Sequence, residues 1–309
     1  MNLTLKQMRY ITTVLQKGSI AKAAKALNIS QSSVVSAIDQ AEADLGQPMF
    51  RRIPAKGLLA TEFGRTVGER LEKFLDEARV LDSDLRGLTG RPGGLLRIGC
   101  YAPAAPHVLP TILKALRADY PDIRIDLREG DMQRINDMLT DGEVDVALTY
   151  RRQTSDRLPF EPLFRAPPWA LLPYPSKLAE QDCVTLAELA ELPMVLLDLP
   201  GTNAYFRKLF EDNGLDLDIA HSTKSSFVLR GLVAADFGFS ILNICGVHDR
   251  DGAGGYIARP ICGKLDSPLF GVAYSLTAER SALVQSVLST CRDVVESGTL
   301  QPLVTQDQA

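Results

Sequence analysis

Residues 19–46 read SIAKAAKALNISQSSVVSAIDQAEADLG, and this stretch decides the fold of the N-terminal part. Ser19 can cap a short helix, whose small Ala23 and Ala24 let a second helix approach closely. Residues 28–30 predict a turn, after which apolar side chains recur at helical spacing until a glycine ends the pattern. The stretch therefore predicts two helices joined by a tight turn.

A helix precedes this pair and a basic hairpin follows it. Apolar side chains recur at helical spacing between Leu5 and Leu15, and residues 50–61, with Arg, Pro, Lys and Gly, predict a short hairpin, or wing. Residues 1–65 contain nine Lys or Arg against four Asp or Glu, although the whole chain has a net charge of -4. Because its positive charge is concentrated there, residues 1–65 are predicted to form a winged helix-turn-helix domain that binds DNA.

The next segment predicts a helix that pairs with another helix. Between Thr66 and Leu85 the apolar residues step by four, three, four, three and four. The seam consists of Val67, Leu71, Phe74, Ala78, Leu81 and Leu85. A two-in-seven apolar stripe suits helix pairing better than a globular core, so residues 66–87 are predicted to be a linker helix that dimerises.

Residues 88–94 are rich in Gly and Pro and predict a hinge. From residue 95 onward, strand and helix patterns alternate, which predicts an α/β domain of two doubly wound lobes with parallel sheets. The expected domain covers residues 95–309, with lobe I at about 95–163 and 268–297 and lobe II at about 164–267. Crossovers are expected near Leu163 and Pro268, with a ligand between the lobes.

Composition narrows the class of protein further. The chain is 45% hydrophobic and 23% charged, as in ordinary globular proteins. No stretch has the length of a membrane span, and the N-terminus lacks the apolar run of a signal peptide. Five widely spaced cysteines fit a reducing compartment better than a disulfide framework. We therefore expect a cytoplasmic protein without a membrane partner.

Particular residues in this order resemble the bacterial LysR-type transcriptional regulators. The matching positions are Gly18-Ser19, Ala23-Ala24, Leu27, Gln31, Ser33-Val34, Ser36, Ile38, Glu42, Leu45-Gly46, Phe50-Arg51-Arg52, Thr61 and Gly64. The resemblance implies a transcription regulator whose effector domain is similar to periplasmic solute-binding proteins. It also implies double-stranded promoter DNA carrying an inverted repeat, self-association into dimers that pair into homotetramers, and RNA polymerase as a candidate partner.

The residues expected to face DNA are short polar side chains at the start of the second helix of the motif and cations on the wing. A helix N-terminus favours phosphate, and arginine suits the backbone or the minor groove. The candidates are Ser19, Lys25, Gln31, Ser32, Ser33, Ser36, Arg51, Arg52 and Lys56. Some of these side chains could instead cap a helix or be solvated charges.

The residues expected to bind the effector follow the ends of the predicted strands, where doubly wound lobes bind ligands. The candidates are Tyr101, Ala102, Pro103, Ala104, Glu129, Gly130, Thr149, Tyr150, Thr202, Asn203, Phe227 and Asn243. The turn before Thr202 could offer free helix amides to a carboxylate, and Arg128 or Arg151 could pair with an anion. These side chains favour a small organic acid, either aromatic or not, and binding should change the conformation of the assembly.

Two other classes of protein remain as alternatives. A two-lobed α/β enzyme would need a catalytic constellation, but the three histidines are scattered, and no common catalytic motif is present. We therefore predict no catalytic residue, no metal and no cofactor. A redox-sensing regulator of the same fold would need a close pair of thiols, which the spacing of the cysteines does not suggest.

Overall fold

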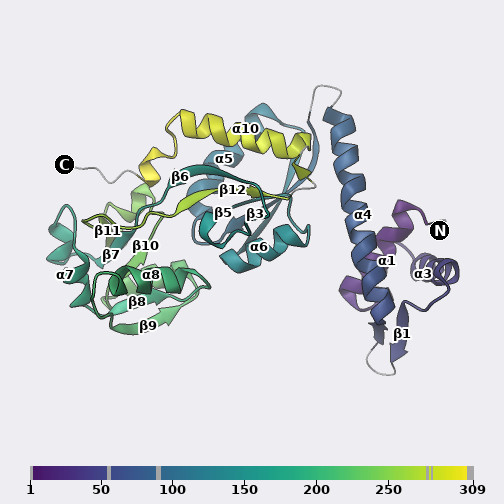
Figure 1. The fold of residues 1–309 in the computed structure, drawn as a ribbon, viewed down its shortest axis with the longest axis horizontal. Helices are drawn as coiled ribbons and strands as arrows, with labels where there is room; N and C mark the ends of the chain where they lie inside the picture. Colours follow the sequence, from purple (N-terminus) through teal and green to yellow (C-terminus); the bar gives the residue numbers. More distant parts are fainter. Residues whose placement is uncertain (1–2, 54–56, 88–91, 276–277, 280, 305–309) are drawn as a thin grey trace. The chain divides into compact units, whose positions relative to one another are not determined.

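The computed structural model describes residues 3–53, 57–87, 92–275, 278–279 and 281–304. The chain divides into two compact units, residues 1–82 and 83–309. Figure 1 shows an all-helical bundle with a small hairpin in the first unit and sheets flanked by helices in the second. Each unit has its own buried apolar core.

The first unit is a winged helix-turn-helix. Its elements are α1 (Leu5–Lys17), α2 (Ile20–Leu27), α3 (Gln31–Leu45), β1 (Phe50–Ile53) and β2 (Gly57–Ala60). Ser19 caps α2 with its side chain, and Gly18 and Gly46 adopt left-handed conformations that end α1 and α3. The two strands pair antiparallel as the predicted wing.

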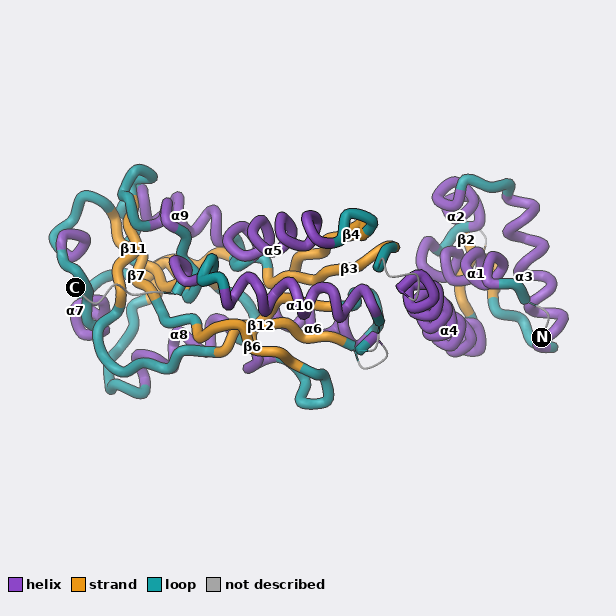
Figure 2. Tube along the Cα trace, turned by 90° about the horizontal axis from the view of Figure 1, so that it is seen from above, coloured by secondary structure: helices purple, strands orange, loops and turns teal. Residues whose placement is uncertain are grey.

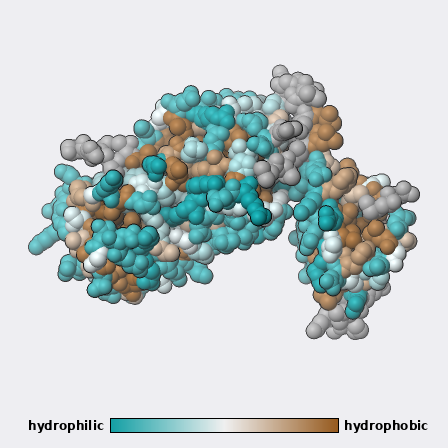
Figure 3. Space-filling model, in the orientation of Figure 1, coloured by the Kyte–Doolittle hydropathy of each residue, from teal (hydrophilic) through white to brown (hydrophobic). Residues whose placement is uncertain are grey.

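The long helix α4 (Glu62–Gly87) follows the wing. Leu71 is buried in the core of the first unit, and Val67 packs against that core. Phe74, Leu81 and Leu85, further along the same seam, are exposed, and Figure 3 shows apolar surface in this part of the chain. The first half of the predicted seam therefore completes a domain core, whereas the second half has its apolar side chains in solvent.

Lobe I is built on a five-stranded sheet in the order β4-β3-β5-β12-β6. Its strands are β3 (Gly94–Tyr101), β4 (Ile123–Gly130), β5 (Val146–Tyr150), β6 (Phe160–Arg165) and β12 (Leu269–Tyr274). Helices α5 (Ala105–Asp119), α6 (Met132–Thr140) and α10 (Ala282–Glu296) pack on this sheet, with α5 and α10 side by side (Figure 2). The doubly wound core is present as predicted, but β12 runs antiparallel to both of its neighbours.

Lobe II combines a three-stranded sheet, β10-β7-β11, with the parallel pair β8-β9. The strands are β7 (Trp169–Pro173), β8 (Met194–Leu197), β9 (Ile219–Thr223), β10 (Ser240–Leu242) and β11 (Tyr256–Pro260). The helices are α7 (Leu186–Ala190), α8 (Thr202–Glu211) and α9 (Ser226–Ala234). Short 3-10 turns η1 (Arg151–Gln153), η2 (Leu178–Glu180), η3 (Val247–Asp249) and η5 (Gln301–Leu303) lie between or after these elements.

Two segments connect the lobes. Residues 166–168 lead from β6 to β7, and residues 261–268 return from β11 to β12. The crossover expected near Leu163 is therefore displaced, because residues 160–165 pair with β12 as a strand of lobe I. The two connections touch where Ala166 N donates to Pro268 O over 3.0 Å.

The expectation that no two cysteines are close is wrong. Cys183 and Cys262 are joined by a disulfide, with their Cα atoms 5.7 Å apart. The two cysteines are 79 residues apart in the sequence, so their spacing did not predict the pair. The fold brings them together because the segment before α7 lies alongside the end of β11. In the described part of the chain, no helix is both long and apolar enough to span a bilayer.

Candidate functional site

The start of α3 presents a cluster of hydroxyl groups at the surface. Ser30, which the sequence analysis placed only in the turn, is the N-cap, and its side chain accepts from Ser33 N. The Ser30 hydroxyl also lies 2.9 Å from that of Ser32 and 2.8 Å from that of Ser33. These hydroxyls stand at the positive end of the helix, a favourable place for a phosphate.

The structure places the other predicted DNA contacts as follows. Lys25, Gln31, Ser32, Ser33 and Ser36 are exposed on α2 and α3, and Arg51 is exposed on the wing strand β1. Ser19 is half-buried and caps α2. Arg52 belongs to β1, but its side chain lies outside the described residues, as does all of Lys56.

Two of the family-like residues hold the wing onto the helices. The Glu42 carboxylate accepts from Met49 N at 2.6 Å and Phe50 N at 3.1 Å. The Thr61 hydroxyl donates to Pro48 O and accepts from Gly64 N, at 2.9 Å each, where α4 begins. These residues shape the surface and need not touch DNA.

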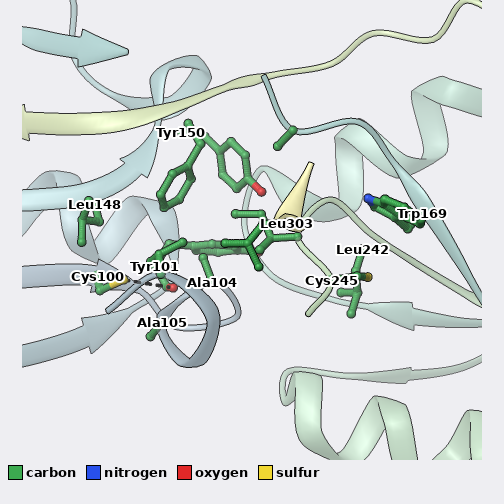
Figure 4. Close-up of a cluster of buried hydrophobic side chains, with 14 of the residues drawn as sticks. Cys100, Tyr101, Ala104, Ala105, Leu148, Tyr150, Trp169, Leu242, Cys245 and Leu303 are labelled. Atoms are coloured by element: carbon green, nitrogen blue, oxygen red, sulfur yellow. Dashed lines mark hydrogen bonds between the residues drawn. The ribbon is translucent and has the colours of Figure 1, made fainter. Parts of the chain in front are cut away.

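A narrow pocket lies between the lobes and is only about large enough for one water molecule. Five of the predicted residues line it, namely Tyr101, Pro103, Ala104, Tyr150 and Asn243. The opposite wall comes from Leu197, Phe206, Leu242 and Ile244, which the sequence analysis missed. Figure 4 shows Tyr101 and Tyr150 on the lobe I side and Leu242 on the lobe II side.

A hydrogen bond closes this cleft. Tyr101, at the end of β3, and Thr202, the first residue of α8, have their hydroxyl oxygens 2.8 Å apart, and both residues are buried. Burial raises the pKa of Tyr101 to about 12, so its hydroxyl remains protonated at neutral pH. The contact joins Tyr101, which lines the pocket, to α8 of lobe II.

Arg152, in the turn after β5, contacts the ring of Tyr150, which lines the pocket. All three of its guanidinium nitrogens are buried, and within the described part of the chain none has a hydrogen-bond partner. The guanidinium lies 4.9 Å from the ring centre of Tyr150 and 4.1 Å from that of Tyr205. Cation–π contacts offset only part of the cost of burying a charge, so this cation lacks an anionic partner.

The pKa values of the nearby tyrosines reflect their burial and the positive charge of Arg152. Burial raises the pKa of Tyr205 to about 12 and that of Tyr150 well above its ordinary value, while the charge of Arg152 opposes the rise at both. The rings of Tyr150 and Tyr205 thus contact one guanidinium, whose charge also opposes the rise that burial causes in the pKa of Tyr101.

The two arginines suggested by the sequence already have partners. Arg128 lies 3.1 Å from Glu143 and 3.5 Å from Asp126. Arg151 lies 3.0 Å from Asp156. Because carboxylates of the chain already neutralise both cations, Arg152 is the better anion anchor.

The helix amides expected to bind a carboxylate are already engaged. Thr202 N and Asn203 N both donate to Leu199 O at 3.1 Å, because Gly201, with φ 72°, turns the chain back onto that carbonyl. Asn203 also donates to the Asp198 side chain over 2.7 Å. The expectation of free amides at this turn is therefore wrong for these two groups.

The remaining predicted effector residues do not line the pocket. Ala102 N donates to Gly130 O, so this pair ties β3 to β4. Thr149 is buried in β5, and Glu129 is exposed at the end of β4. Phe227, expected as an aromatic wall, is 85% exposed on α9; the aromatic side chain that lobe II contributes to the pocket is Phe206. Asn243 donates to Ala166 O and Tyr205, and so joins the crossover to the pocket.

A charged cluster makes a second contact between the lobes. His107, on α5 of lobe I, has its Nε2 3.3 Å from Arg230 Nη2 and 3.8 Å from Asp249 Oδ2, both of lobe II. Asp249 accepts from Arg230, Tyr256 and the Gly246 amide. Burial lowers the pKa of His107, with Asp249 opposing and Arg230 adding to the effect. Among the described residues no group of side chains has the arrangement of a metal site.

Comparison with known proteins agrees with both units. Residues 5–65 match the family model of the bacterial regulatory helix-turn-helix protein, lysR family, and residues 89–296 match the LysR substrate binding domain. An uncharacterized HTH-type transcriptional regulator of Shigella flexneri, YfeR, is 29% identical over 247 residues, 78% of this chain and 79% of its own length.

Solved structures show the same architecture. HinK, a LysR family transcriptional regulator from Pseudomonas aeruginosa, is 28% identical with a TM-score of 0.62, covering 95% of this chain and 99% of its own. CbnR, solved in complex with its target DNA, has a TM-score of 0.67 at 18% identity, covering 94% and 99%, and so shows the fold alone. Family models match both the winged helix-turn-helix unit and the two-lobed α/β unit, and the chain therefore belongs to the LysR family of transcriptional regulators.

Proposed function

We propose that this regulator binds an inverted repeat in promoter DNA as a twofold dimer and responds to a small organic carboxylate held between the lobes. The proposal that the ligand is a carboxylate rests on one observation, the buried guanidinium of Arg152 that lacks a hydrogen-bond partner among the described residues. The family membership carries the DNA-binding role, and the two parts of the proposal are tested separately.

On the DNA side, the exposed start of α3 enters the major groove in this proposal. Gln31 and Ser36 then reach base edges, while the hydroxyls of Ser32 and Ser33 and the wing cation Arg51 contact phosphates. The exposed apolar half of α4 supports pairing of two chains, which would set the distance between the half-sites. Paired dimers would form the tetramer expected for the family.

On the effector side, a carboxylate supplies the anion that Arg152 lacks. A planar carboxylate can accept two parallel hydrogen bonds from one guanidinium, and such pairs are strong when buried. The rings of Tyr150 and Tyr205 beside Arg152 favour an aromatic or otherwise flat acid. Because the pocket is so small while Tyr101 contacts Thr202, binding requires the lobes to separate, which supports a coupled change of conformation.

The effector proposal is tested with Arg152→Met and, as the matched control, Arg151→Met. Benzoate, salicylate and succinate, each compared with its uncharged amide, are added to the full-length protein while thermal unfolding is followed. We expect at least one acid, and no amide, to raise the unfolding temperature of the wild type and of Arg151→Met but not of Arg152→Met. An equal response of Arg152→Met would remove Arg152 from the site, and a response to the amides would exclude an anionic ligand.

The DNA proposal is tested by sequencing genomic fragments that the purified protein retains. We expect enrichment of an inverted repeat whose half-sites are separated by a whole number of helical turns. Enrichment of single half-sites, or no enrichment, would contradict the twofold arrangement. The genes beside the retained fragments would then indicate which acids to test.

A further inference from the structure

We propose that Cys183 and Cys262 form a reversible thiol–disulfide pair that reacts with low-molecular-weight disulfides such as glutathione disulfide. Its oxidation state sets the freedom of residues 261–268, the segment that returns from lobe II to lobe I. This redox site is separate from the effector and DNA sites and does not depend on either.

Of the five cysteines, only Cys183 and Cys262 are accessible to solvent. Cys183 is exposed and Cys262 is half-buried, whereas Cys100, Cys245 and Cys291 are buried. Burial, the largest effect, raises the pKa of each of these three thiols far above its ordinary value. Because the thiolate is the reacting form, a dissolved disulfide can reach only the Cys183–Cys262 pair.

The backbone keeps the two thiols close when they are reduced. Cys262 N donates to Val184 O at 2.7 Å, and Val184 N donates to Pro260 O at 3.0 Å. The two segments therefore run side by side without the covalent bond, and the thiols remain within reach of each other. This arrangement favours rapid closure of the disulfide once one thiol has reacted.

The reaction is a two-step exchange with the protein dithiol as reductant. A thiolate of the pair attacks one sulfur of glutathione disulfide, forming a mixed disulfide and releasing one glutathione thiolate. The second thiolate then attacks the protein sulfur of the mixed disulfide and releases the second glutathione thiolate. Two electrons pass from the protein to glutathione disulfide, and the two thiol protons are taken up by the released glutathione.

The position of Cys262 links this chemistry to the lobes. Cys183 directly precedes the segment that carries α7, whose Leu186 and Leu189 are buried in the core. Cys262 stands at the beginning of the crossover, so the disulfide attaches the crossover to the body of lobe II. Four residues later, Asp266 O accepts from the Tyr205 hydroxyl over 2.7 Å. Reduction therefore leaves the start of this connection held by backbone hydrogen bonds alone, which can open locally where the covalent bond cannot.

Hydrogen exchange of the full-length protein, followed by mass spectrometry, tests the proposal. The protein is equilibrated in reduced glutathione or in glutathione disulfide, and the Cys183–Cys262 linked peptide is measured in parallel. We expect the linked peptide only in the oxidised sample, with several-fold slower exchange there in residues 261–268. Exchange in α5, residues 105–119, should be the same in both samples.

The double variant Cys183→Ser, Cys262→Ser is the matched control, because serine differs from cysteine by one atom. It should exchange at residues 261–268 as fast as the reduced wild type and should not respond to glutathione disulfide. A thermal transition like that of the reduced wild type establishes that the variant folds. Absence of the linked peptide in the oxidised sample, or equal exchange in both redox states, overturns the proposal. No DNA or effector is used, so the result does not depend on the ligand.

Discussion

The ligand that the cleft can bind depends on single side chains. Two adjacent arginines, Arg151 and Arg152, differ in whether a carboxylate of the chain neutralises them. Arg151 is paired with Asp156, five residues away, whereas the guanidinium nitrogens of Arg152 are buried and its guanidinium contacts the rings of Tyr150 and Tyr205. The sequence predicted Tyr101, Tyr150 and Asn243 because strand ends and the family pattern point to them. It could not select Arg152, since the contrast depends on Tyr205, 53 positions along the chain, and on burial that only the fold reveals.

A side chain at position 64 is predicted to destabilise the N-terminal unit. An added Cβ would lie 2.0 Å from the Met49 carbonyl oxygen, which is backbone held by the wing. Gly64→Ala is therefore expected to destabilise the N-terminal unit by about 2 kcal/mol and to weaken DNA binding. The measurement is chemical unfolding together with a DNA titration.

Gly68→Ala is the matched control in the same helix. There an added Cβ would meet only the end of the Leu15 side chain, which can rotate away. The usual gain of about 0.5–1 kcal/mol for alanine in a helix should offset the adjustment. Equal losses in the two variants would show that the contact with Met49 O is not what makes Gly64 necessary.

Helices were easier to predict than strands. The apolar periodicity gave the positions of α1 and α3 to within a few residues, because one face of each is buried. The short strands β6, β9 and β11 were missed: in β9 most side chains are exposed and apolar alternation is absent. In α4 the apolar seam was predicted, but its first half serves the core of its own unit.

The second half of α4 carries a prediction about assembly. Leu81 is 58% exposed on the seam, and a carboxylate there would be buried in a paired helix without a partner. Leu81→Glu should therefore shift the protein toward monomer and weaken binding to an inverted repeat. Lys73→Glu places the same carboxylate at an exposed position beside the seam and should leave the assembly intact. Sedimentation measures both, and an undissociated Leu81→Glu protein would place the dimer contact elsewhere.

Arg51, on the wing, is predicted to contribute to the salt dependence of DNA binding. Arg51 is exposed on β1, and a cation that neutralises one phosphate adds about 1 to the slope of log affinity against log salt concentration. Arg51→Ala should reduce that slope by about 1 on every DNA sequence, whereas Arg51→Lys should keep it. An unchanged slope in the alanine variant would mean that Arg51 does not touch the backbone.

Across the two lobes, the contact of His107 with Arg230 and Asp249 predicts a pH dependence. The folded protein lowers the pKa of His107, so the unfolded chain binds more protons as pH falls below about 6.5. The stability due to neutral His107 is therefore complete above that pH and is lost as pH falls through the lowered folded pKa. Protonated Nε2 can no longer accept from Arg230.

Thermal unfolding between pH 7.5 and 5.5 measures this effect. The wild type should lose more stability over this interval than His107→Gln, which cannot titrate. His248→Gln is the control, because the His248 side chain is 98% exposed, and it should behave like the wild type. If His107→Gln follows the wild-type curve, other groups cause the pH dependence.

The division of α4 between two roles also affects the fate of partial products of this chain. Leu71 and Val67 of α4 complete the core of the winged helix-turn-helix unit. A fragment that ends near residue 87 therefore keeps all the residues of this core but lacks the two-lobed domain. If α4 pairs two chains as proposed, such a fragment, released by proteolysis or made deliberately, would pair with intact chains and bind their DNA sites without an effector domain. It would act as a dominant inhibitor of the regulator from which it came.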